Sequence, residues 1–212
     1  MRASLLLTVL LVGTGALAQA PTTDGAHAAH PKQGLIDLLL EYLAVRYPGH
    51  RTDTGHVLYC SVQRQRLFHV VGGTLIAEFA IATSKSGLGS EQDSYRTPTG
   101  LHRVAEKHGH GVSQFGILKD RIFTGELADS DSEGADKDWI TSRILWLEGL
   151  EEGVNRGGAV DSYARYIYIH GTANERSVGA PSSRGCIRMR NADVIALFNA
   201  VPVGALVAIL DN

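Results

Sequence analysis

Residues 166–172 read YIYIHGT and residues 181–189 read PSSRGCIRM, and these two segments carry the strongest structural signal in the chain. In the first segment, alternation places Ile167 and Ile169 on one face of a strand and the two tyrosines with His170 on the other. The pattern predicts a strand over residues 163–170, after which Gly171 allows the backbone to turn. His170 would therefore project from the end of a rigid strand.

The second segment has the composition that surrounds reactive thiols. Cys186 needs a neighbouring base to become a thiolate at neutral pH, and the imidazole of His170 can serve as that base. A glycine before the thiol permits close approach of a substrate and a backbone N–H pocket for an oxyanion. In an extended chain Arg188 shares the face of Cys186, where a guanidinium could bind a carboxylate. The neighbours that create this polar, basic surrounding are Ser183, Arg184, Gly185 and Arg188.

The rest of the sequence reads mainly as short strands. Strands are predicted at residues 57–62, 67–71 and 75–83, joined as a meander, and again at 101–104, 139–147 and 205–210. Two helices are predicted, at residues 35–47 and from an Asn191 N-cap to about residue 201. We detect no internal repeat and no change of composition, so we predict a single domain over residues 34–212.

The net charge of the chain and the clustering of its acidic residues restrict the classes of molecule that it can bind. The chain has 20 Lys and Arg against 22 Asp and Glu, a net charge of −2, which disfavours binding to a phosphate backbone. Residues 126–138 form an acidic loop that we expect to face solvent. Residues 129–134 resemble the start of a calcium loop, but Ile140 stands where a bidentate Glu is required.

The N-terminus has the three parts of a secretory signal: Arg2, an apolar run over residues 5–12 and an Ala-Gln-Ala end at residues 18–20. We predict a signal peptide over residues 1–20, a flexible lead-in over 21–33 and no membrane span after cleavage. Export makes the two cysteines informative. Cys60 lies in a strand-like run and reads as a buried, inert thiol, although a bridge to Cys186 remains an alternative.

The two opening segments, together with NAD at residues 191–193 and TPTG at residues 97–100, resemble the L,D-transpeptidase catalytic domain of bacterial cell-wall enzymes. The resemblance extends over residues 55–210. It implies a mainly β fold with short helices, a β-sandwich of mixed sheets. It also implies the site: Cys186 as nucleophile, His170 as general base oriented by the carbonyl of Gly171, Ser183 and Gly185 shaping the oxyanion pocket, and Arg188 contacting substrate. Arg184 departs from the common pattern, where many members carry His.

The implied reaction is acyl transfer on peptidoglycan stem tetrapeptides in the periplasm or cell envelope. The thiolate would cleave the bond between diaminopimelate and D-Ala and pass the acyl group to an amine, either of a second stem or of a wall protein. No metal or organic cofactor is expected, and a carbapenem should react with Cys186. Residues 117–139 are candidates for a lid.

Several alternatives remain open. Water as acceptor would make the protein an L,D-carboxypeptidase or amidase, and a non-catalytic wall-binding module would bind peptidoglycan without turnover. A sortase-like enzyme also orders His before Cys, but the Thr-Cys context typical of sortases is absent. His108 and His110 suggest a metal site, although two ligands are too few for a closed zinc site.

Overall fold

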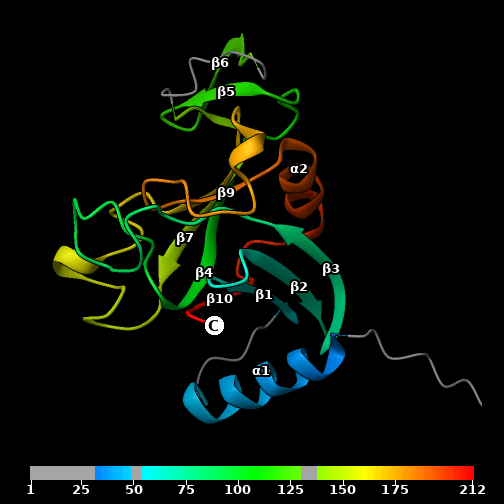
Figure 1. Ribbon diagram of the computed structural model, residues 1–212, viewed down its shortest axis with the longest axis vertical. Helices are drawn as coiled ribbons and strands as arrows, with labels where there is room; N and C mark the ends of the chain where they lie inside the picture. Colours follow the sequence, from blue (N-terminus) through cyan, green and yellow to red (C-terminus); the bar gives the residue numbers. More distant parts are fainter. Residues whose placement is uncertain (1–31, 49–53, 130–137) are drawn as a thin grey trace, which may run out of the picture.

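The computed structural model describes residues 32–48, 54–129 and 138–212 (Figure 1). The predicted signal peptide, most of the lead-in and the segment with the calcium-loop resemblance lie outside the described residues.

The described residues form a 10-stranded mixed sheet with two α-helices. The predicted meander and the predicted strands at 101–104, 139–147 and 205–210 are all present. The strands are β1 His56–Ser61, β2 Arg66–Val71, β3 Thr74–Ala80, β4 Gly100–His108, β5 Gly116–Lys119, β6 Ile122–Leu127, β7 Ile140–Gly149, β8 Tyr168–Thr172, β9 Ile187–Met189 and β10 Leu206–Leu210. The α-helices are α1 Gln33–Arg46 and α2 Asn191–Ala200, and short 3₁₀ turns occur at Gly158–Val160 and Glu175–Ser177.

The sheet runs in the order β3-β2-β1-β10-β4-β7-β5-β6, and β8 and β9 branch from β7. Two pairs are parallel, β1 with β10 and β8 with β9, while the other pairs are antiparallel. The sheet curls so that its β1–β2–β3 end and its β7–β9 end lie on opposite sides of a common interior (Figure 1). This arrangement confirms the predicted mainly β fold of mixed strands with short helices.

The main core lies inside this curl. It joins Leu58 and Leu67 of the first two strands to Leu145, Ile169 and Ile187 of β7, β8 and β9, and α2 closes one side. Cys60 belongs to this core, and burial raises the pKa of its thiol to about 12. Cys60 and Cys186 are both free thiols, so the alternative of a bridge between them is not realised.

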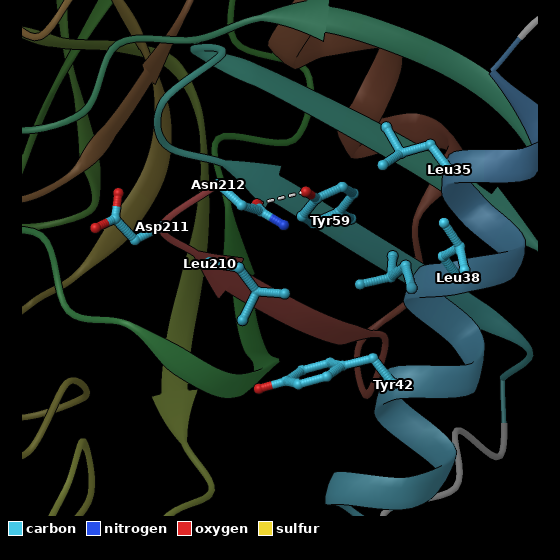
Figure 2. A pocket seen from close by; sticks show the side chains of 8 residues that line it. Leu35, Leu38, Tyr42, Tyr59, Leu210, Asp211 and Asn212 are labelled. Carbon is cyan, nitrogen blue, oxygen red and sulfur yellow. Dashed lines mark hydrogen bonds between the residues drawn. The ribbon is translucent and has the colours of Figure 1, made fainter.

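Helix α1 covers the outer face of β1 and β2, with Ile36, Leu39 and Leu43 buried against them. Between α1 and the end of β10 lies a groove of about 440 Å³ (Figure 2). On its wall the hydroxyl of Tyr59 donates a hydrogen bond to Asn212 Oδ1 at 2.6 Å. Within the described ranges, no helix is long and apolar enough to cross a membrane.

Two local expectations are wrong. The strand predicted over 163–170 begins only at Tyr168, because Tyr166 has a left-handed φ of 58° and the Asp161 carboxylate accepts hydrogen bonds from Gly157 N and Ala164 N. The strand then continues through Gly171 and Thr172 instead of turning after His170. Asn191 is not the N-cap of α2, since the helix starts at Asn191 itself and Arg190 precedes it as the cap.

Candidate active site

Strands β8 and β9 position the two residues that the sequence singles out. The parallel register pairs Ile169 with Ile187 and His170 with Arg188. Both isoleucines point into the main core, so His170 and Arg188 project from the opposite face. Cys186 immediately precedes β9 and packs on that same face, against a cluster that includes Tyr168. Cys186 and His170 therefore lie on the same face of the β8–β9 pair.

The loop before Cys186 is held by Ser183. Its hydroxyl donates to Cys186 O at 2.5 Å and accepts from Gly185 N at 3.2 Å, which closes the loop around one buried side chain. Gly185 has a φ of 125°, a value that L side chains rarely adopt, and its carbonyl accepts a hydrogen bond from Thr97 Oγ1 at 2.9 Å. The Gly185 N–H is thus bound within the loop. Thr97, from the TPTG segment, is a loop-fixing residue that the sequence did not single out for this task.

The Cys186 thiol lies against the backbone of the turn that leads into β8. Its sulfur is 3.4 Å from Tyr168 N, which donates to it, and 3.3 Å from Tyr166 O. Desolvation raises the pKa of Cys186 to about 11, the Tyr168 N–H lowers it, the charge of Asp138 raises it, and Arg188 and Arg165 lower it. In this state Cys186 is a neutral thiol. Among the described residues, no hydrogen bond joins its sulfur to His170.

His170 is 2% exposed, and its ring is fixed by its own neighbour. Its Nδ1 lies 2.7 Å from the carbonyl oxygen of Gly171. Desolvation lowers the pKa of His170, Asp138 and the Gly171 carbonyl raise it, and Arg188 lowers it. The neutral imidazole that results must donate from Nδ1 to this carbonyl, which leaves the lone pair on Nε2.

Arg188 is buried beside His170 and has a partner that the sequence did not reveal. Its Nη2 lies 2.5 Å from Asp138 Oδ1, and the two side chains are 8% and 25% exposed. Asp138 belongs to the acidic stretch that we expected to face solvent, and for this residue the expectation is wrong. Arg188 is therefore paired with Asp138 and is not exposed to bulk solvent.

Asn191 fastens the strand that carries His170 to its surroundings. Its Oδ1 accepts hydrogen bonds from Thr141 Oγ1 and Ser142 Oγ, both at 2.6 Å, and its Nδ2 donates to Thr172 O at 2.8 Å. Asn191 is fully buried. The sequence suggested a polar role for this residue at a helix start. In the structure its side-chain partners lie on β7, on β8 and at Glu175, to which Nδ2 also donates at 2.8 Å.

An aromatic cluster borders the thiol. Trp146 stacks on Tyr163 with ring centroids 4.0 Å apart and meets Tyr168 edge-on at 5.5 Å. Arg121, in the turn between β5 and β6, reaches over this cluster: its guanidinium lies 4.8 Å from the Trp146 ring and donates to Tyr168 Oη at 3.2 Å. The hairpin that begins the lid candidate at residues 117–139 therefore contacts the neighbourhood of Cys186. Residues 130–137 lie outside the described residues.

The histidines of the alternative metal site do not gather ligands. His108 Nε2 lies 2.9 Å from Glu106 Oε2, and His110 is exposed. In the part of the chain that the structure describes, no group of three or more His, Cys, Asp or Glu side chains could hold a metal ion.

Gly171→Ala should destabilise the protein by about 2 kcal/mol, a value typical of overpacking. A Cβ on Gly171 would lie 2.7 Å from both Thr141 O and Asn191 Oδ1, so the β7–β8 pair must move apart. Urea unfolding followed by circular dichroism measures the loss. Gly34→Ala is the matched control, because a Cβ there meets nothing within 4 Å and a helix favours Ala by about 0.5 kcal/mol. Equal stabilities of wild type and Gly171→Ala would contradict the close-approach explanation.

With this geometry in place, comparison with known proteins identifies the class. The family model of the L,D-transpeptidase catalytic domain, YkuD, matches residues 55–209. The chain therefore belongs to the L,D-transpeptidase catalytic domain family, as its two motifs indicate.

Individual relatives match over short segments. The chain is 54% identical over 48 residues to "Putative L,D-transpeptidase YqjB" of Bacillus subtilis, which covers 23% of this chain and 27% of that protein. It is 49% identical over 54 residues to "Probable L,D-transpeptidase ErfK/SrfK" of Salmonella typhimurium, or 24% of this chain and 18% of that one. The matches thus span less than a third of either relative. Among solved structures, L,D-transpeptidase 3 from Mycobacterium tuberculosis aligns over 74% of this chain and 60% of its own, with 15% identity and a TM-score of 0.46.

Proposed function

We propose that the protein is an exported cysteine acyltransferase that acts on peptidoglycan stem tetrapeptides, with Cys186 as nucleophile and His170 as general base. The observation that supports this most directly is the placement of both side chains on one face of the β8–β9 pair, with His170 Nδ1 held by the Gly171 carbonyl. A base whose Nε2 lone pair is free, on the same face as a thiol, is an arrangement that nucleophilic catalysis can use.

The first step follows from the protonation states. A neutral thiol and a neutral imidazole face the substrate, so the proton must move from Cys186 Sγ to His170 Nε2 as the sulfur attacks the carbonyl of diaminopimelate. The hydrogen bond from the thiol to Tyr166 O must break for this, which a rotation of the Cys186 side chain achieves. The tetrahedral intermediate then collapses, the imidazolium gives its proton to the departing amine, D-Ala leaves, and a thioester remains.

The second step repeats this chemistry with a new amine. The side-chain amine of another stem, or of a wall protein, attacks the thioester while His170 Nε2 accepts its proton. The Cys186 thiolate is the leaving group, and it recovers the proton from the His170 imidazolium. The enzyme therefore gains and loses no net proton. Water in place of the amine would give hydrolysis. Assay of a purified tetrapeptide for cross-linked dimer against free tripeptide separates transfer from hydrolysis.

The location follows from the predicted signal peptide. We infer export to the periplasm or cell envelope, where stem peptides are available, and folding with a reduced Cys186. The aromatic cluster and Arg121 lie near the sulfur. We assign them to the wall of the substrate-binding site that lies next to the β5–β6 hairpin.

Exposure of the mature protein to a carbapenem should add one drug mass to Cys186, because the β-lactam is an acyl donor for the same thiol. Intact-mass spectrometry and peptide mapping locate the adduct. Cys186→Ser should abolish it and His170→Ala should slow its formation by about a hundredfold, the contribution of a general base. Cys60→Ser is the matched control and should react like wild type, since Cys60 is fully buried. An adduct on another residue, or none, would contradict the proposal.

A further inference from the structure

A second pocket opens beside the loop that carries the nucleophile. It has a volume of about 350 Å³ and is lined by Lys85, Ser86, Tyr95 and Arg184. Its two walls are joined through the backbone: Lys85 N donates to Ser183 O at 3.1 Å, and Ser84 pairs with Ser183. Arg184 is two residues from Cys186 along the chain. Because two residues span at most about 7 Å, one wall of the pocket lies close to the residue that carries the sulfur.

The charge of this pocket is one-sided. Lys85 and Arg184 are both exposed, and within residues 32–48, 54–129 and 138–212 neither forms an ion pair with a carboxylate. None of the four lining residues is acidic. Two unpaired cations around one hollow are a site for an anion, because each could donate charge-assisted hydrogen bonds to it.

Further positive charge acts on the thiol. Arg165 donates from Nη2 to Arg96 O at 2.8 Å, and its charge acts on Cys186. Arg96 itself lines an adjoining pocket together with Gly89, Ser90, Glu91 and Ser94. Arg165 thus adds positive charge near Cys186, while Asp93 acts on Arg165 and Glu91 lines the adjoining pocket.

We propose that Lys85 and Arg184 form a subsite for a free carboxylate of the stem peptide that donates the acyl group. This proposal rests on the proposed function and adds the substrate feature that the site selects. A stem tetrapeptide carries three free carboxylates near the scissile bond: one on the second residue, one on the side chain of diaminopimelate and one on the terminal D-Ala. Amidation of any of them removes its charge.

The test measures binding without turnover. Tetrapeptides with all three carboxylates free, and with the second residue, diaminopimelate or the terminal D-Ala amidated singly, are titrated into Cys186→Ala by calorimetry. We expect one of the three amidated peptides to bind about tenfold more weakly than the free form, which identifies the carboxylate. Adding Lys85→Gln and Arg184→Gln should weaken the free peptide about tenfold and leave that amidated peptide unchanged.

Arg46→Gln, which removes an exposed charge on α1, is the matched control. It should change the affinity of neither the free nor the amidated peptides. Equal binding of all four peptides, or an equal loss for free and amidated forms in the Lys85 and Arg184 variants, would overturn the subsite. The proposed function is judged separately by consumption of the free peptide by the wild-type protein. A protein that discriminates the peptides in the Cys186→Ala background but consumes none supports the subsite and contradicts the acyl transfer.

Discussion

Arg188→Met should lower the free energy of unfolding by about 3 kcal/mol, one of the largest effects of any single substitution near the site. Methionine keeps the length of the stem but removes the charge that faces Asp138 at 2.5 Å. The Asp138 carboxylate is only 25% exposed, so it keeps most of its desolvation cost after its partner is lost. Urea unfolding of wild type and variant gives the difference.

A double-mutant cycle separates the pair from the packing of Arg188. Asp138→Asn alone should also destabilise, because it leaves the guanidinium without its anion. The combination Arg188→Met with Asp138→Asn should lose at least about 1 kcal/mol less than the sum of the single losses. Additive losses would mean that the two charges do not interact across the loop.

The same two variants should shift the pKa of His170 in opposite directions. Asp138 raises the pKa of His170 and Arg188 lowers it, so Asp138→Asn should lower this pKa further while Arg188→Met should raise it. If His170 must be neutral to act as a base, the acid limb of the pH profile for carbapenem acylation should move down in the first variant and up in the second. A loss of rate without movement of that limb would point to misfolding alone.

The strands and the two motifs were predictable because their signals are local. Alternation at Ile167 and Ile169 and the glycine before Cys186 constrain a few neighbouring residues, and the structure keeps those relations. The placement of Cys186 next to Tyr168 also follows from alternation once β8 and β9 pair.

The partners of the site could not be predicted, because they come from distant parts of the chain. Asp138 lies in a run of acidic residues, and nothing in the local sequence marks it as the one that pairs with Arg188. Gly171 was assigned to a turn because glycine often marks one, yet here it is needed for the close approach of Thr141 and Asn191 across two elements. Such requirements are set by the pairing of β7 with β8, which local sequence does not encode.

His102 should make the folded protein lose about 3 kcal/mol of stability as the pH falls from about 6.5 to about 4. Its side chain is fully buried between Gly100 O at 3.1 Å and Ser162 Oγ at 2.9 Å. Burial lowers the pKa of His102 to about 4, the Gly100 carbonyl opposes this shift, and the charge of Arg165 adds to it. In the unfolded chain the imidazole binds a proton near pH 6.5, whereas the folded chain binds none until about pH 4. Stability is therefore complete above pH 6.5 and declines through that window.

His102→Gln should flatten this decline, because glutamine can occupy both hydrogen bonds without titrating. Urea unfolding at pH 7, 6, 5 and 4 gives the slope, and the variant is expected to be less stable than wild type at pH 7 but to close the gap at pH 4. His69 and His170 also have lowered pKa values and keep a residual slope in the variant. The exposed His110→Gln should retain the full wild-type slope. If His102→Gln declined as steeply as wild type, the acid sensitivity would come from other groups with lowered pKa values, such as His69, His170 and Glu106, and protonation of His102 would not destabilise the fold.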